Sequence, residues 1–188
     1  DVSASSMTGL TTMALRTPGR SYGPCTLALR GVHQIANAVV AVRLLEALDA
    51  AGVSVPPPAV VDGLTRAQWR GRLELVSFDD GREVLLDAAH NPAGAECLAA
   101  YLRDAYPGGL PLVFGVMQDK NIEGMLRALL PHATRIVLTS PPSPRAASPS
   151  DVGALVAKLK PGLPVQIESD PSRAITCAFQ SARAICVA

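Results

Sequence analysis

The stretch Val84-Leu85-Leu86-Asp87-Ala88-Ala89-His90-Asn91-Pro92 decides the fold, because it joins an apolar run to the start of a helical pattern. The apolar run is typical of a buried strand, and the helical pattern begins at Ala93. Asn91 can cap this helix by accepting a hydrogen bond from a backbone N–H. Pro92 suits the first helical position, where a missing N–H leaves nothing unpaired. We therefore predict a strand that passes directly into a helix.

The polar side chains of this stretch lie where the strand ends. In an open α/β sheet, ligands bind at the carboxyl ends of the strands. Asp87 is placed to accept hydrogen bonds from a sugar hydroxyl, and His90 is placed to pack on, or donate to, a neighbouring group. The alternative is that Asp87 and Asn91 only satisfy the backbone of the loop.

Strand and helix patterns alternate after residue 59, which predicts an α/β fold with a Rossmann-like, mostly parallel sheet and helices on both faces. The turn residues Asp79-Asp80-Gly81 predict a hairpin, so the first strand should be an antiparallel edge strand. Helices are expected at 59–66, 93–106, 122–130, 151–159 and 172–183, and strands at 73–78, 84–86, 112–116, 135–139 and 165–168, followed by an apolar run at 185–187.

The first part of the chain has a different pattern. Residues 1–32 indicate β structure with turns, including apolar runs at 10–15 and 25–29, and a long helix is expected at 33–50. Pro56-Pro57-Pro58 favours a stiff, extended connection and marks a boundary between domains 1–56 and 57–188. We expect both ends to be cut, with the second domain truncated in its last strand.

Composition excludes several classes of function. The chain has 188 residues, a net charge of +1 and 48% hydrophobic residues. It lacks the ~18–20 uninterrupted apolar residues of a membrane span. We expect neither a nucleic-acid nor a membrane partner. The four cysteines are widely separated, which indicates reduced thiols in a cytoplasmic protein and no metal site.

Three further segments carry candidate binding residues. His33 and Asn37 share a helix face, and the amide of Asn37 can donate to and accept from a nucleobase. Arg72 lies just before a strand, and its planar guanidinium suits phosphate. Lys120 could meet a carboxylate or a phosphate. Each segment also has a purely structural alternative. His33 and Asn37 could bond to the preceding loop, and Arg72 could be a solvated arginine on an edge strand. Lys120 could lie in a capped surface loop. The sequence contains neither G-x-x-x-x-G-K-[ST] nor G-x-G-x-x-G.

Four short motifs in order resemble the folylpolyglutamate synthase family, whose members often also act as dihydrofolate synthases and belong to the Mur-ligase-like, ATP-dependent amide ligases. The resemblance covers about residue 27 to the end. The motifs are His33-Gln34-x-x-Asn37-Ala38, Gly71-Arg72-Leu73-Glu74, Asp87-x-Ala89-His90-Asn91-Pro92 and Gly115-x-x-x-Asp119-Lys120.

This resemblance implies a two-domain cytoplasmic enzyme that binds ATP in the cleft between its domains. The reaction phosphorylates a folate carboxylate, and the amino group of L-glutamate then attacks the acyl phosphate. By the resemblance, Asn37 would contact adenine, Arg72 the phosphates and Asp87 the ribose, with His90 beside the nucleotide. Residues 1–56 would be the tail end of the central ATPase domain, and a monomer is expected.

The sequence also departs from the family. The phosphate-binding loop, the Mg²⁺ ligands and the catalytic lysine of the first domain are absent, so the Mg²⁺ ligands are expected in a missing amino-terminal part. The family's Asp-Lys-Asp reads Asp119-Lys120-Asn121 here. We expect no catalytic residue in these 188 residues and no turnover by them alone. The alternatives are another Mur-type ligase, or a non-catalytic α/β module that binds a nucleotide or a partner.

Overall fold

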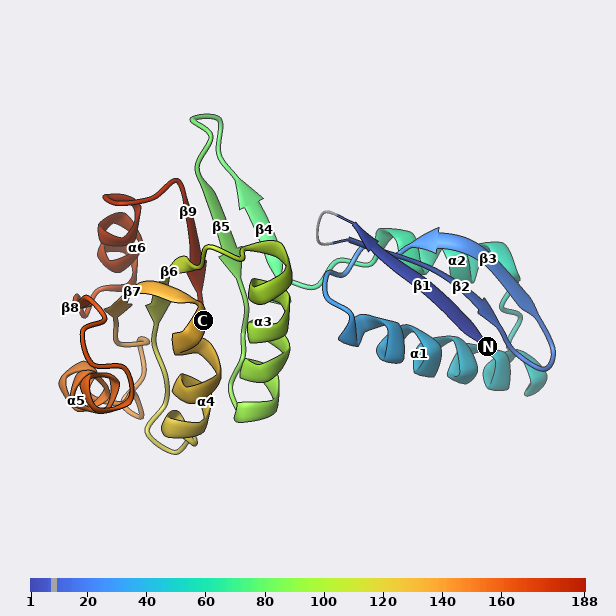
Figure 1. Ribbon diagram of the computed structural model, residues 1–188. Helices are drawn as coiled ribbons and strands as arrows, with labels where there is room; N and C mark the ends of the chain where they lie inside the picture. Colours follow the sequence, from blue (N-terminus) through green and yellow to red (C-terminus); the bar gives the residue numbers. More distant parts are fainter. Residues whose placement is uncertain (8–9) are drawn as a thin grey trace. The chain divides into compact units, whose positions relative to one another are not determined.

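A three-stranded sheet and a six-stranded sheet form the cores of two units, Asp1–Arg70 and Gly71–Ala188 (Figure 1). The computed structural model describes residues 1–7 and 10–188. None of the helices in these two stretches is long and apolar enough to cross a membrane.

The first unit packs two helices against an antiparallel sheet. Along β2, inward and outward side chains alternate, so Met13 and Leu15 are buried together with Val42 of α1 and Val60 of α2. The elements are β1 (Val2–Met7), β2 (Leu10–Arg16), β3 (Ser21–Thr26), α1 (His33–Ala50) and α2 (Pro57–Arg66).

Two local predictions for this unit were wrong. The apolar run at 25–29, expected to be β structure, overlaps only the end of β3, and the turn expected at Gly23-Pro24 lies inside that strand, because an irregularity in its pairing with β2 accommodates these residues on an edge strand. The proline run does not stay extended, because α2 begins at Pro57, and prolines are tolerated in the first helical turn.

The division between the two units falls after Arg70, whereas the sequence suggested a boundary at residue 56. The difference arises from α2, whose Val60 is 3% exposed and belongs to the core of the first unit. Ala28 N–H also donates to the carbonyl of Leu64 at 3.1 Å, which ties the end of α2 to the segment after β3.

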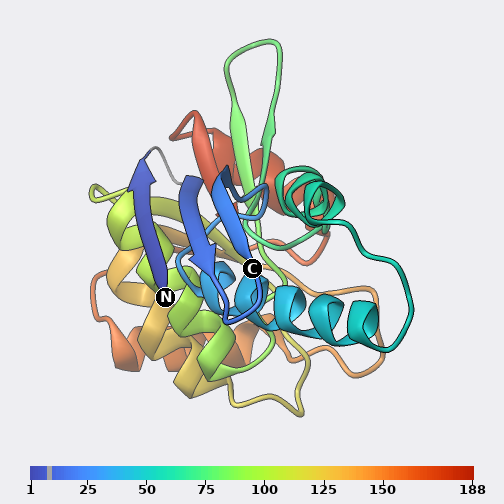
Figure 2. The same ribbon diagram turned by 90° about the vertical axis from the view of Figure 1, so that its right-hand side faces the viewer.

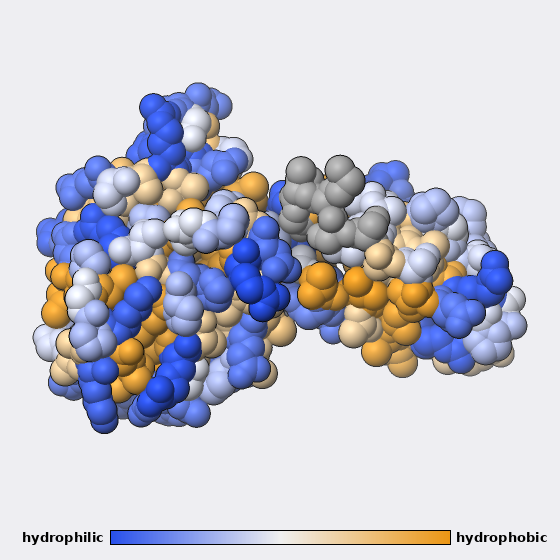
Figure 3. All heavy atoms as spheres, in the orientation of Figure 1, coloured by the Kyte–Doolittle hydropathy of each residue, from blue (hydrophilic) through white to orange (hydrophobic). Residues whose placement is uncertain are grey.

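The outer face of α1 is also apolar. Val40, Leu44 and Leu48 are 59%, 61% and 48% exposed, and Figure 3 shows hydrophobic surface along this side of the first unit.

The second unit is the α/β domain that the sequence predicted. Its strand order is β4-β5-β9-β6-β7-β8, in which only the β4–β5 pair is antiparallel. The elements are β4 (Glu74–Ser77), β5 (Glu83–Leu86), α3 (Pro92–Ala105), β6 (Leu110–Phe114), α4 (Ile122–Leu129), the 3₁₀ turn η1 (Leu130–His132), β7 (Ala133–Leu138), α5 (Pro149–Leu159), β8 (Val165–Ile167), α6 (Pro171–Phe179) and β9 (Ala184–Val187).

Helices cover both faces of this sheet (Figure 1, Figure 2). Leu112 and Phe114 of β6 pack in one core with α3, α4 and α5, while Val113 packs in a second core with Ala174 and Ala178 of α6. Successive side chains of a strand point to opposite faces, so β6, which is buried throughout, serves both cores. The polar residues after β5, β6 and β7 then lie at the carboxyl edge of one sheet.

Candidate functional site

Asp87 lies where β5 and β9 end side by side. Its N–H donates to the carbonyl of Val187 at 2.9 Å, and its carboxylate oxygen Oδ2 accepts from the N–H of Leu73 at 3.0 Å. Burial raises the pKa of the neighbouring Cys186 thiol, and the negative charge of Asp87 raises it further. The half-buried Asp87 carboxylate is therefore held at the carboxyl edge of the sheet, directly after the strand that the sequence predicted.

The loop before β4 is fixed against Asp87 on both sides of Arg72. Ala88 N–H donates to the carbonyl of Gly71 at 2.7 Å, and Leu73 N–H donates to Asp87. Leu73 has φ +46°, although its side chain is 1% exposed in the core. A leucine in this region costs roughly 1–2 kcal/mol, so these contacts and the buried side chain must hold it there.

Arg72 itself is half-buried, and in the described part of the chain its guanidinium makes no hydrogen bond or ion pair. Gly71, which precedes it, has φ +67°, a conformation that favours glycine, and its N–H donates to Glu74 Oε2 at 2.8 Å. The loop thus fixes the backbone of Arg72 while leaving its five N–H donors available for an anion.

His90 and Asn91 follow at the start of α3. His90 Nδ1 lies 3.1 Å from the carbonyl oxygen of Ala88, and a carbonyl only accepts, so Nδ1 carries the proton. Its Nε2 is then the acceptor that faces Asn91 Nδ2 at 3.4 Å. Asn91 Oδ1 accepts from Gly94 N–H at 2.8 Å, which confirms the predicted cap and places the exposed His90 beside the helix start.

The loops after β6 and β7 pack together at the same edge. Gln118 N–H donates to the carbonyl of Arg145 at 2.8 Å. Lys120 Nζ pairs with Asp119 Oδ2 at 3.0 Å, and this contact lowers the pKa of the Asp119 carboxyl. Asn121 caps α4 through Gly124 N–H at 2.9 Å. The loop after β6 is therefore a capped surface loop, the purely structural role considered for Lys120, and it also carries the Lys120–Asp119 ion pair.

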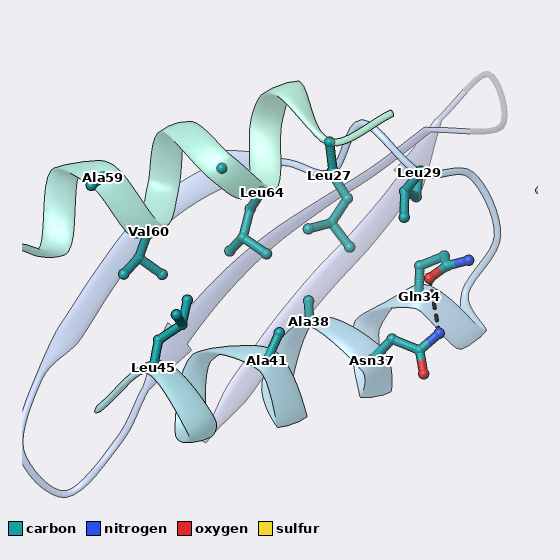
Figure 4. A pocket seen from close by; sticks show the side chains of 12 residues that line it. Leu27, Leu29, Gln34, Asn37, Ala38, Ala41, Leu45, Ala59, Val60 and Leu64 are labelled. Carbon is teal, nitrogen blue, oxygen red and sulfur yellow. Dashed lines mark hydrogen bonds between the residues drawn. The ribbon is translucent and has the colours of Figure 1, made fainter. Parts of the chain in front are cut away.

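Asn37 belongs to the first unit and lines an apolar groove between α1 and α2, about 290 Å³ in volume (Figure 4). Its side chain is exposed, and its Nδ2 donates to Gln34 Oε1 at 2.9 Å. Arg72, Asp87 and His90 therefore share one edge of the second unit, whereas Asn37 belongs to the first. Gln34 was not singled out from the sequence, although its spacing of three residues from Asn37 on a helix predicts such a contact.

In the described ranges, 1–7 and 10–188, no three His, Cys, Asp or Glu side chains gather in a way that could hold a metal ion. The four cysteines are free, with Cys25 and Cys186 buried.

A mostly parallel sheet covered by helices, with polar loops at its carboxyl edge, defines an open α/β domain, the class of domain whose ligands bind at that edge. Residues 71–187 match the family model described as Mur ligase, glutamate ligase domain, and the chain belongs to that family.

Curated and solved relatives agree with this assignment. The chain is 38% identical over 146 residues to the dihydrofolate synthase/folylpolyglutamate synthase of Mycobacterium tuberculosis, covering 76% of this chain and 29% of that protein. A solved Mycobacterium tuberculosis folylpolyglutamate synthase complexed with ADP superposes with a TM-score of 0.86 at 30% identity, over 98% of this chain and 43% of the other.

A bifunctional folylpolyglutamate synthase/dihydrofolate synthase solved with Mn, AMPPNP and L-glutamate bound has a TM-score of 0.73 at 25% identity, covering 99% of this chain and 42% of the other. The chain thus spans about a third of the length of the curated relatives it matches first.

Proposed function

We propose that these residues form the carboxyl-terminal part of an ATP-dependent ligase that adds L-glutamate to folates. The family match and the relatives described above support this proposal. The observation that carries it is the loop around Arg72, whose backbone is bonded on both sides to Asp87 and Ala88 while its guanidinium stays unpaired in the described structure. In this proposal, the first unit, Asp1–Arg70, is the end of the central ATP-binding domain.

Each candidate residue then has a role in holding ATP. Asn37 contacts adenine, Arg72 the phosphates and Asp87 the ribose, while His90 lies beside the nucleotide. A bidentate guanidinium suits phosphate oxygens, and its charge offsets the negative charge that develops during phosphoryl transfer. The remaining acceptor capacity of the Asp87 carboxylate suits a ribose hydroxyl, because an ionised carboxylate accepts several hydrogen bonds.

The chemistry proceeds in two balanced steps. A folate carboxylate oxygen attacks the γ-phosphorus of ATP, and ADP leaves as the acyl phosphate forms. The amine of L-glutamate then attacks the acyl carbon, phosphate leaves, and the nitrogen loses a proton to give the amide. Mg²⁺ would offset charge on the phosphates, but no set of described residues fits it. Its ligands, and the catalytic groups, would come from other parts of the ligase, so these 188 residues alone would be inactive.

The test substitutes Arg72 in the complete ligase. Arg72→Ala should lower kcat/KM for ATP-dependent glutamate ligation at least tenfold, about 1.4 kcal/mol of transition-state stabilisation. Arg70→Ala is the matched control, since Arg70 is exposed and lies two residues away. It should leave kcat/KM nearly unchanged.

An unchanged kcat/KM for Arg72→Ala would remove Arg72 from the site. Equal losses in both variants would show only a general effect of positive charge. Ligation of an amino acid other than glutamate would instead place the protein in another branch of the Mur ligases.

A further inference from the structure

Gln34 is one of few buried polar side chains in the described structure, with 7% of its surface exposed. It lies in the first turn of α1, beside the groove between α1 and α2. Its Oε1 accepts from Asn37 Nδ2 at 2.9 Å, and its Nε2 lies 3.1 Å from His33 Nε2. The side chains of His33, Gln34 and Asn37 thus form a chain of contacts at the start of α1, with Gln34 in the middle.

These bonds have a direction. An amide nitrogen only donates and an amide oxygen only accepts. Because Gln34 presents its oxygen to Asn37, the amide of Asn37 must turn its nitrogen toward Gln34. Figure 4 shows the result: the nitrogen of Asn37 faces Gln34, and its oxygen points away. While Gln34 keeps its oxygen on this side, the reversed amide of Asn37 would place two oxygens against each other at hydrogen-bonding distance, which is unfavourable.

The fixed amide offers a ligand one acceptor, Oδ1, next to one remaining N–H donor. Adenine presents the complementary pair, the N6 amino group as donor and N7 as acceptor. Guanine presents two acceptors, O6 and N7, at the same edge and would need two donors. An Asn37 amide held in this orientation therefore suits adenine and mismatches guanine.

We propose that Gln34 is a positioning residue that locks the Asn37 amide and so sets the preference for adenine over guanine nucleotides. The inference rests on the proposed function, in which Asn37 contacts the adenine of ATP. Gln34 acts through Asn37 and need not touch the nucleotide.

The test compares kcat/KM for ATP and for GTP in the complete ligase. Gln34→Lys can only donate and favours the reversed amide, so the ATP-to-GTP ratio of kcat/KM should fall at least tenfold, mainly through a higher KM for ATP. Gln34→Leu has a similar volume but no polar group, so it frees the Asn37 amide to take either orientation, and the ratio should fall about twofold. Gln34→Glu keeps an acceptor toward Asn37 and should leave the ratio unchanged.

A purely structural role for Gln34 would lower kcat/KM for both nucleotides equally. An unchanged ATP-to-GTP ratio in Gln34→Leu and Gln34→Lys would therefore overturn the inference. Asn37→Ala separates this failure from that of the proposed function. If Asn37→Ala weakens ATP use while the Gln34 variants keep the ratio, only the positioning role falls; if Asn37→Ala changes nothing, the adenine contact itself is wrong.

Discussion

Asp49 on α1 shows how one carboxylate can fasten a connecting segment to a helix. Its Oδ1 accepts from Val55 N–H at 2.7 Å, and its Oδ2 pairs with the Arg20 guanidinium. The hydrogen bond from Val55, followed by that from Arg20, lowers the pKa of Asp49 below its ordinary value of 3.8. Arg20 also donates to the carbonyl of Val55 at 3.1 Å. Asp49 therefore joins three segments: α1, the turn before β3 and the connection before α2.

A lowered folded-state pKa means that the ionised Asp49 stabilises the fold above the unfolded pKa and ceases to do so as the pH falls through the folded pKa. Asp49→Asn should lower the melting temperature at neutral pH, and the difference from the parent chain should shrink as the pH falls below about 3.8 and vanish once the pH is below the lowered pKa of the folded chain. Thermal unfolding across this pH range measures the effect.

Asp62→Asn is the control, because in the described structure Asp62 forms its ion pair with the exposed Arg66, and the substitution should change stability little. A pH-independent difference between Asp49→Asn and the parent would show that the charge of Asp49 is not what stabilises the fold.

The sequence was enough to select candidate residues, but not to predict the backbone and side-chain conformations around them. Arg72, Asp87 and His90 could be selected because strand ends and an arginine beside glycine are visible in the sequence. The left-handed conformation of Leu73 could not, because nothing local favours it; it arises from a buried side chain and the bond to Asp87. The direction of the Asn37 amide likewise depends on a neighbouring side chain.

At the scale of elements, two helices are packed unusually closely at their starts. A Cβ added at Gly124 of α4 would lie 2.9 Å from Pro92 Cγ of α3 and 3.0 Å from the side chain of Asn121, the cap of its own helix. Gly153 of α5 is different, since its nearest neighbour would be Leu138 Cδ1 at 3.4 Å, an ordinary contact.

We expect Gly124→Ala to destabilise the second unit by about 1 kcal/mol, because overpacking outweighs the gain in helix propensity. Gly153→Ala should instead stabilise it by about 0.5–1 kcal/mol, since only the propensity term remains. Urea denaturation of both variants gives the two free energies of unfolding. Stabilisation of both to the same extent would show that α3 and α4 have room to separate.

Element boundaries were predictable where a cap or a turn marks them. The helix at 33–50 agrees with α1, and Asn91 and Asp79-Asp80-Gly81 fixed the start of α3 and the β4–β5 hairpin. The sequence did not reveal the true limits of β3, because an edge strand with few buried side chains carries a weak alternating pattern.

At the scale of the whole molecule, the strand order contains the least predictable feature. β9 follows every other strand in the sequence, yet it lies between β5 and β6. A parallel sheet was predictable from the alternation of strands and helices, but alternation alone does not say where a strand inserts. Pairing of Val84 with Ile185 connects positions that are remote along the chain.

The central position of β9 predicts unequal effects for two isoleucines. Ile185 is fully buried, so Ile185→Ala should lower the free energy of unfolding of the second unit by about 2–5 kcal/mol. Ile167 of the edge strand β8 is 50% exposed, and Ile167→Ala should cost under about 1 kcal/mol. Guanidinium denaturation compares them. Similar costs at both positions would contradict the central role of β9.

This strand order also has a consequence for synthesis on the ribosome. The β4–β5 hairpin and the β6–β8 layer emerge first, but each exposes an unpaired strand edge until β9 has left the exit tunnel. During that interval the nascent polypeptide is vulnerable to aggregation, and chaperone binding to those bare edges would protect it.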